Sequence, residues 1–167
     1  MNKGDFINRM LCLVAILGSL NTNAANKEIM LQKIKNLDFD TVLPKTGSCY
    51  YDSQKNNTIR NTKDSTCSSY SGSNGKFKLT AEPFQIVEIE FKSKKSPDGQ
   101  VIFQPEGVAK IELDEFAIYT NTPTKLKLGP SGVIDIVMGG KLIFINELSH
   151  GLNYSLDYDI NYKYSHN

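Results

Sequence analysis

The chain has 167 residues, of which 40% are hydrophobic and 22% are charged, and its formal net charge is +1. This length is typical of one domain, and the balanced charge argues against a nucleic-acid partner. The composition is too hydrophobic for a chain that is disordered throughout. No apolar run reaches the roughly 18 residues that would predict a membrane-spanning helix.

The N-terminal segment 1–24 has the organisation of a secretory signal peptide. Lys3 and Arg9 precede or border an apolar run at 10–20, and small residues follow up to Ala24. A buried helix of a cytosolic domain is the alternative, but the run lacks helical amphipathicity. We therefore expect this segment to be removed and the protein to be exported to the periplasm, the cell surface or the extracellular space.

Two of the three cysteines, Cys49 and Cys67, lie in the remaining domain, residues 25–167. In an oxidising compartment an isolated pair is most simply a disulfide, and two unpaired surface thiols are the alternative. A zinc site would need more ligands, and none lie nearby. The expected bridge spans 67 − 49 = 18 residue steps and would stabilise the fold by about 3 kcal/mol.

The segment 45–75 is dominated by Ser, Thr, Asn, Gly, Lys and Asp, with Ile59 as its only aliphatic residue. Such a composition is a poor source of core residues, so it predicts a long polar surface loop bracketed by the disulfide. Tyr50, Tyr51 and Tyr70 flank the cysteines. They could contact a ligand, and packing over the disulfide is the simpler use.

From residue 76 onward, short segments of alternating apolar and polar residues are separated by Gly and Pro, which is typical of half-buried strands. The expected strands are 76–80, 87–91, 101–103 closed by Pro105 and Gly107, 111–118 as one strand or two split near Asp114, 125–128, 133–138, 142–145 and 154–164. Gly139-Gly140 predicts a turn or a bulge. About eight to ten strands predict an all-β, antiparallel β-sandwich with Greek-key connections.

The last expected strand has the clearest alternation. One of its faces is entirely aromatic and aliphatic, and it consists of Tyr154, Leu156, Tyr158, Ile160, Tyr162 and Tyr164. Such a face must lie on the core of its own domain or on a partner.

No constellation of residues indicates catalysis, a cofactor or a metal. The two histidines occur without a nucleophile elbow. Asp157, Asp159 and Asn161 imitate the start of a calcium loop, but Tyr162 occupies the position that requires glycine. We therefore predict that the protein is not an enzyme and has no cofactor and no metal site.

Three segments together resemble a bacterial secreted, pilin-like family, domain of unknown function 4402. They are Asn36-Leu-Asp-Phe-Asp-Thr-Val-Leu-Pro, Gly75-Lys-Phe-Lys-Leu-Thr-Ala-Glu-Pro, and Met138-Gly-Gly-Lys-Leu-Ile-Phe with the following Gly151-Leu-Asn-Tyr-Ser-Leu-Asp-Tyr-Asp-Ile-Asn-Tyr. Asp40 stands where the family usually has glycine. The resemblance implies an immunoglobulin-like sandwich and a fimbrial or adhesive role at the cell surface, without catalytic residues.

Fimbrial subunits assemble by β-strand addition, so the resemblance implies other fimbrial subunits and a periplasmic chaperone as partners. A donor strand would be an alternating N-terminal extension. Ile29 and Leu31 alternate, but the phase breaks at Lys33 and Ile34, so this segment belongs either to such an extension or to the first strand itself. The alternative function is a self-completed, secreted module that binds carbohydrate or protein through the 45–75 loop.

Overall fold

The structure is a computed structural model that describes residues 28–54, 59–60, 65–67, 72–148 and 158–165. The expected signal peptide, together with Tyr70, Tyr154 and Leu156, lies outside the described residues. No helix occurs in the described part of the chain, so this part offers no candidate for a membrane-spanning helix.

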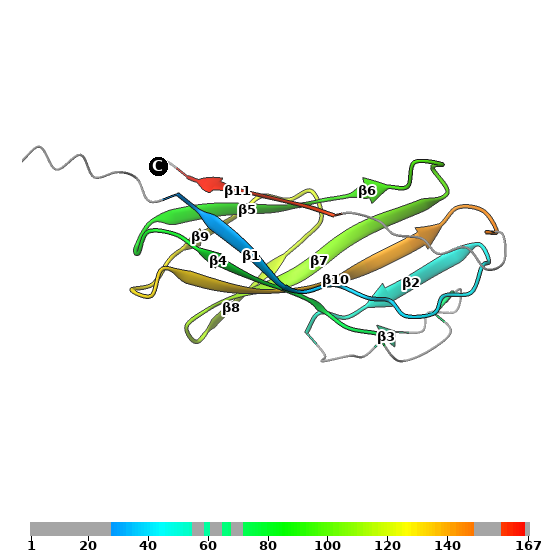
Figure 1. Cartoon of the computed structure of the whole chain (residues 1–167), viewed down its shortest axis with the longest axis horizontal. Helices are drawn as coiled ribbons and strands as arrows, with labels where there is room; N and C mark the ends of the chain where they lie inside the picture. The colour runs from blue at the N-terminus through cyan, green and yellow to red at the C-terminus, as the bar shows by residue number, and fades with distance from the viewer. Residues whose placement is uncertain (1–27, 55–58, 61–64, 68–71, 149–157, 166–167) are drawn as a thin grey trace, which may run out of the picture.

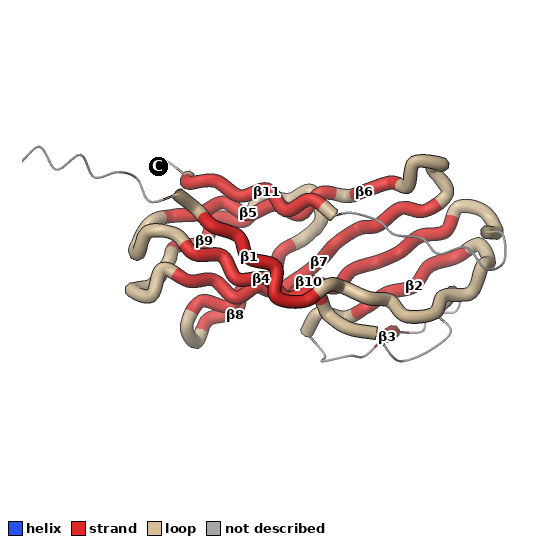
Figure 2. Tube along the Cα trace, viewed as in Figure 1, coloured by secondary structure: helices blue, strands red, loops and turns tan. Residues whose placement is uncertain are grey.

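The predicted all-β class is confirmed, with two antiparallel sheets packed as a sandwich (Figures 1 and 2). The described residues form eleven strands, of which two contain only two residues each. In chain order the strands are β1 (Met30–Lys35), β2 (Gly47–Tyr51), β3 (Ile59–Arg60), β4 (Gly75–Thr80), β5 (Ile86–Lys92), β6 (Lys94–Lys95), β7 (Val101–Ile111), β8 (Asp114–Ile118), β9 (Thr124–Lys127), β10 (Val133–Phe144) and β11 (Asp159–Tyr164).

The larger sheet is built on two long strands, β7 and β10, which pair along almost their whole length. The first half of β10 also pairs with β4, and β1 lies beyond β4 at the edge of the sheet. The second half of β10 pairs with β2, which β3 extends. On the far side of β7 lie β6 and β8. The smaller sheet has the order β11-β5-β9.

The main core lies between the smaller sheet and the first half of β10. Alternation places Val87, Ile89 and Phe91 of β5 on the inner face, and all three are fully buried. Across from them, Ile134 and Ile136 of β10 are buried as well. These side chains belong to one continuous cluster, so the period-two pattern of the sequence correctly identifies the faces that the two sheets bury.

The second half of β10 is covered by the segment that joins β1 to β2. Phe39 of this segment packs its ring edge-on against Tyr51 and Phe103, at centroid distances of 6.2 and 5.8 Å. Val42 pairs with Cys67 through an isolated antiparallel bridge. This arrangement corrects the prediction of a long polar surface loop over 45–75, because β2 at its start is an integral strand of the larger sheet and contributes its own buried cluster.

The glycine pair at 139–140 does not end a strand, contrary to the prediction of a turn or bulge, and β10 runs through it without interruption. A Cβ on Gly139 would collide with the carbonyl oxygen of Tyr51, and one on Gly140 with that of Gln104. Gly140 also has a φ of 134°, which L side chains rarely adopt. The glycines are required by close approach of the neighbouring strands.

The structure also corrects the end of one predicted strand and decides between the two alternatives for another. The predicted strand 101–103 extends to Ile111, through Pro105 and Gly107. The segment 111–118 forms two strands, with the turn at Glu112 and Leu113.

At the N-terminal edge, the phase break noted at Lys33 and Ile34 corresponds to a register shift in the pairing of β1 with β4, between Lys33 and Lys35. A bulge of this kind lets a strand keep its pairing while the alternation of its side chains slips by one residue. The described part of this segment, from Met30 to Lys35, is therefore the first strand of the sheet.

Candidate functional site

In the part of the chain that the structure describes, two neighbouring strands each have one backbone edge that pairs with no other strand. Among the described residues, β1 pairs only with β4, and β11 pairs only with β5. The two strands lie near each other, because residues of both line one hollow, and each is at the edge of its sheet. An unpaired edge presents a row of N–H and C=O groups that can pair with another strand. We call the two strands and the space between them the open edge.

A slot of about 370 Å³ lies in the open edge. Its apolar lining comes from Leu31 of β1, Phe77 of β4, Ile160 of β11, and Tyr158, which immediately precedes β11. The rings of Phe77 and Tyr158 meet edge-on with centroids 5.6 Å apart. Apolar side chains of this size favour cover by another apolar group, so the slot is suited to receive one or two side chains of a partner.

The rim of the slot is polar. It consists of Lys33, Asp159 and Asn161, and all three are exposed. An apolar floor with a polar rim is the pattern of a binding site in which burial supplies affinity and the rim supplies orientation.

The alternation of β11 sets which of its side chains face inward. Ile160 and Tyr164 are partly buried and pack against the main core. Tyr164 also anchors the strand, because its hydroxyl oxygen accepts a hydrogen bond from the Glu82 backbone N–H at 3.1 Å. Tyr162 lies on the same face but remains 37% exposed. Of the predicted partner-strand residues that are described, Tyr162 is therefore the one most available to a partner.

The backbone of β11 turns alternate residues toward its free edge. Ser165 donates its N–H to the carbonyl oxygen of Ile86 at 2.9 Å, which makes this opposed pair a hydrogen-bonded pair. In a regular antiparallel ladder such pairs alternate with non-bonded ones. The odd-numbered residues of β11 therefore bond to β5, and Ile160 and Tyr162 direct their N–H and C=O groups to the opposite edge of the strand, which we call the free edge of β11.

The outer face of β11 and β5 carries paired charges. The Nζ atom of Lys163 lies 3.1 Å from Oε1 of Glu88, and Oδ2 of Asp159 lies 2.8 Å from Nζ of Lys94 on β6. A second hollow, of about 570 Å³, lies beside β11 and includes Glu88, Glu90 and Lys163 in its lining. The charges on this face have alternating signs, so a strand added at the free edge would meet both signs.

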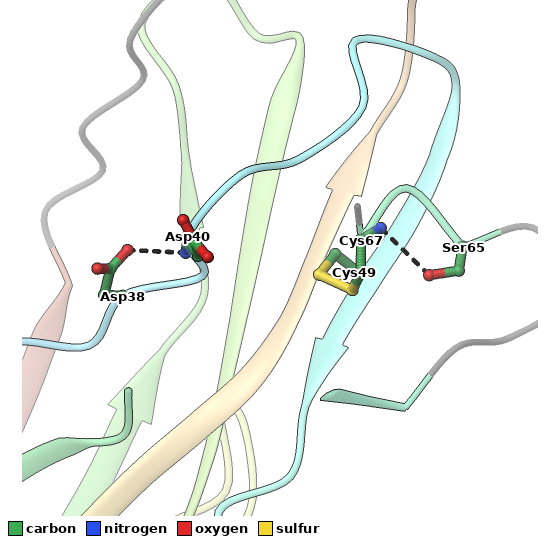
Figure 3. Close-up of a disulfide and its surroundings, with 5 residues drawn as sticks. All are labelled: Asp38, Asp40, Cys49, Ser65 and Cys67. Atoms are coloured by element: carbon green, nitrogen blue, oxygen red, sulfur yellow. Dashed lines mark hydrogen bonds between the residues drawn. A yellow bond between two sulfur atoms is a disulfide. The ribbon is translucent and has the colours of Figure 1, made fainter. Parts of the chain in front are cut away.

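The disulfide is the second predicted site. Cys49 on β2 is bonded to Cys67, with the two Cα atoms 5.0 Å apart, as predicted (Figure 3). Both cysteines are buried, and the Cys67 N–H donates to the Ser65 hydroxyl oxygen at 3.2 Å. The bridge therefore pins the segment around Cys67 to β2 in the interior of the fold.

Of the tyrosines near the disulfide, Tyr50 and Tyr51 are described by the structure. Tyr51 is fully buried in one cluster with Cys49 and Cys67, which is the simpler of the two uses predicted for it and corrects the alternative that it contacts a ligand. Burial raises the pKa of its phenol, and the nearby Asp38 carboxylate raises the pKa further. Tyr50 is half-buried and donates its hydroxyl hydrogen to Glu106 at 3.1 Å.

Sequence reasoning found β11 but missed the other wall of the slot. The sequence pattern indicates only strand alternation for Leu31 and Phe77, and nothing in their spacing indicates that they share a slot with Ile160. For Lys33 the pattern shows only the break in phase. Among the described residues, no group of three or more His, Cys, Asp or Glu side chains is placed to hold a metal ion.

Comparison with known proteins adds no relative. No family model, no curated protein and no solved structure matches this chain.

Proposed function

We propose that the protein is an exported structural or adhesive protein of the cell surface, a pilin-like subunit that assembles through β-strand pairing at its open edge. The observation that carries the proposal is the slot between β1 and β11, whose apolar lining lies between two strand edges that are unpaired among the described residues. A strand added there would satisfy backbone hydrogen bonds and insert its alternate side chains into the slot.

The buried disulfide supports export. Bridges of this kind form and persist in the periplasm and outside the cell, and thiols are kept reduced in most cytosols. The Cys49–Cys67 bond therefore agrees with the signal peptide expected at residues 1–24.

The backbone at Asp40 supports the pilin-like resemblance. Its φ is 56°, in the left-handed region that favours glycine, and glycine is the residue that the resembled family usually has at this position. The partners implied by this proposal are fimbrial subunits and a periplasmic chaperone, each of which would contribute a strand.

The proposal is tested by blocking the free edge of β11 with Tyr162→Pro. Proline removes an N–H that points away from β5, so the strand can keep its own pairing and lose a donor at the free edge. The matched control is Tyr162→Ala, which loses the same ring but keeps the N–H. We expect complexes larger than the single chain, recovered from exporting cells after cross-linking, to be depleted in the proline variant relative to the alanine variant.

Circular dichroism and thermal midpoints establish that both variants fold. Equal amounts of complex in two folded variants would contradict the proposal, as would a wild-type chain recovered only as a monomer.

A further inference from the structure

Strand β11 is complementary to itself, and we propose that it pairs antiparallel with β11 of a second copy, about a two-fold axis through Asn161. This inference rests on the proposed function, because it names the partner of the open edge. In this register Asp159 lies opposite Lys163 of the second copy, and Ile160 lies opposite its Tyr162. The two smaller sheets then join into one continuous sheet.

The backbone phase permits this register. Ile160 and Tyr162 both direct their N–H and C=O groups to the free edge, as the bond from Ser165 to Ile86 establishes. Ile160 of one copy and Tyr162 of the other therefore form a hydrogen-bonded pair on each side of the two-fold axis. Asn161 then faces Asn161 of the second copy as a non-bonded pair, in which the Cβ atoms approach most closely.

The charges on the outer face complement one another in the same register. Within one copy, Lys125 lies opposite Glu88, and Glu88 lies opposite Lys163. The second copy continues this row with Asp159 and then Lys92, which are opposed to each other in the same way. The row across the joined sheet therefore alternates in sign from strand to strand, which favours pairing and opposes a register that places like charges together.

The inner face explains the slot. Tyr162 of the second copy, opposite Ile160, would point toward the space between β11 and β1, where Leu31 and Phe77 line the slot. Tyr164 of the second copy would lie opposite Tyr158, which lines the slot immediately before β11. Each copy would thus cover the apolar slot of the other, and the 37% exposed ring of Tyr162 would be buried.

Other registers satisfy fewer of these conditions. If the register shifts by one residue, each residue that points its N–H and C=O groups to the free edge lies opposite a residue that points them toward its own β5. The two strands then cannot form a regular ladder of hydrogen bonds. A slip to the next register of correct phase places Asp159 opposite Asn161, or Asn161 opposite Lys163, and the pairing of opposite charges is lost.

The register is tested by disulfide trapping in the purified, full-length processed protein. Under mild oxidation, Asn161→Cys should form a covalent dimer, because a residue on the two-fold axis faces its own copy at a distance that a disulfide can span. Asp159→Cys and Lys163→Cys should each remain largely monomeric alone, and should form a covalent heterodimer when mixed. Non-reducing gels and intact mass measure these products.

The matched control is Glu90→Cys, which lies opposite Asn161 on β5 and on the same face. In the proposed dimer the two Glu90 positions are separated by both copies of β11, so this variant should not cross-link. Sedimentation velocity of the wild-type protein should show a concentration-dependent equilibrium between monomer and dimer.

A wild-type protein that stays monomeric up to about millimolar concentration overturns the inference. A dimer that forms while neither Asn161→Cys nor the mixed pair cross-links overturns it as well, because the contact then lies elsewhere. If Tyr162→Pro depletes the complexes relative to Tyr162→Ala, but none of the cysteine variants cross-links, the pairing of β11 with itself is wrong. The proposed function would then stand, with a different strand as the partner of the open edge.

Discussion

At the scale of single residues, Tyr51 illustrates how composition can mislead. It lies in a stretch of polar residues, and its ring is nevertheless fully buried beside Phe39 and the disulfide. The nearby Cys49 indicates in the sequence that the ring could pack over the disulfide, whereas the contact with Phe39 comes from a different segment and is not visible in the local pattern. A tyrosine brings a large apolar area that a small secondary cluster can use.

The raised pKa of Tyr51 predicts that the free energy of unfolding falls at alkaline pH. Its pKa is raised above 10.0 by burial and by Asp38, so the folded state holds the phenolic proton more tightly than the unfolded state. The stability that this group contributes is complete below the unfolded pKa and is lost as the pH rises through the folded pKa. Between about pH 8 and about pH 11, we expect the free energy of unfolding of Tyr51→Phe to fall less than that of the wild type.

Urea denaturation at several pH values measures this difference, and Tyr119→Phe is the control because its ring is 59% exposed. The control should follow the wild type. If Tyr51→Phe loses stability as steeply as the wild type, ionisation of Tyr51 does not contribute to alkaline unfolding.

At the scale of elements, strand alternation identified most of the sheet but misjudged its breaks. Pro105 lies within β7, and the pair Gly139-Gly140 lies within β10. Glycine and proline usually separate strands. Here the glycines are required by neighbouring backbones, namely the carbonyl groups of Tyr51 and Gln104. Such contacts between segments far apart in the chain are not visible in a local pattern.

The second prediction concerns the contribution of the disulfide between β2 and Cys67 to stability. Replacing both cysteines, as Cys49→Ser with Cys67→Ser, should lower the free energy of unfolding by about 3 kcal/mol, because the unfolded chain loses the constraint of a closed loop. Burial of two polar hydroxyls would add to the loss. Urea denaturation of the folded variant measures it.

Ser65→Ala is the matched control for this element. It removes only the hydroxyl that accepts the Cys67 N–H and leaves the bridge intact, so it should cost about 1 kcal/mol. A loss in the double variant no larger than that of the control would show that the bridge does not hold this part of the fold.

At the scale of the whole molecule, β7 and β10 join the two halves. Their inner face is continuous, and it is covered by the smaller sheet at one end and by the segment with Phe39 and the disulfide at the other. The strands with free edges, β1 and β11, lie at the periphery of this arrangement (Figure 2). Stability is therefore expected to fall from the central pair of strands to the open edge.

Hydrogen exchange followed by NMR tests this gradient at a concentration at which the chain is monomeric. We expect the amides of β10 to exchange slowest, because strands flank it on both sides. Within β11 the pattern should alternate, with Asn161 and Lys163 protected by β5 and with Ile160 and Tyr162 exchanging faster. Uniform protection along β11 would contradict the free edge on which the proposals rest.

The sequence alone determined the all-β class, the inner faces of most strands, and the Cys49–Cys67 pair. These features follow from local periodicity and from the small number of cysteines in the expected exported domain. The break in phase at Lys33 and Ile34 even marked the position of a bulge.

Only the tertiary structure decided which residues share a surface. It brought Leu31, Phe77 and Ile160 together across two sheets, placed Tyr51 inside, and carried β10 through two glycines. The physical reason is that alternation defines the face of a strand but not its neighbour. Neighbours are chosen by the packing of the whole chain, and the slot at the open edge exists only between strands that the sequence keeps far apart.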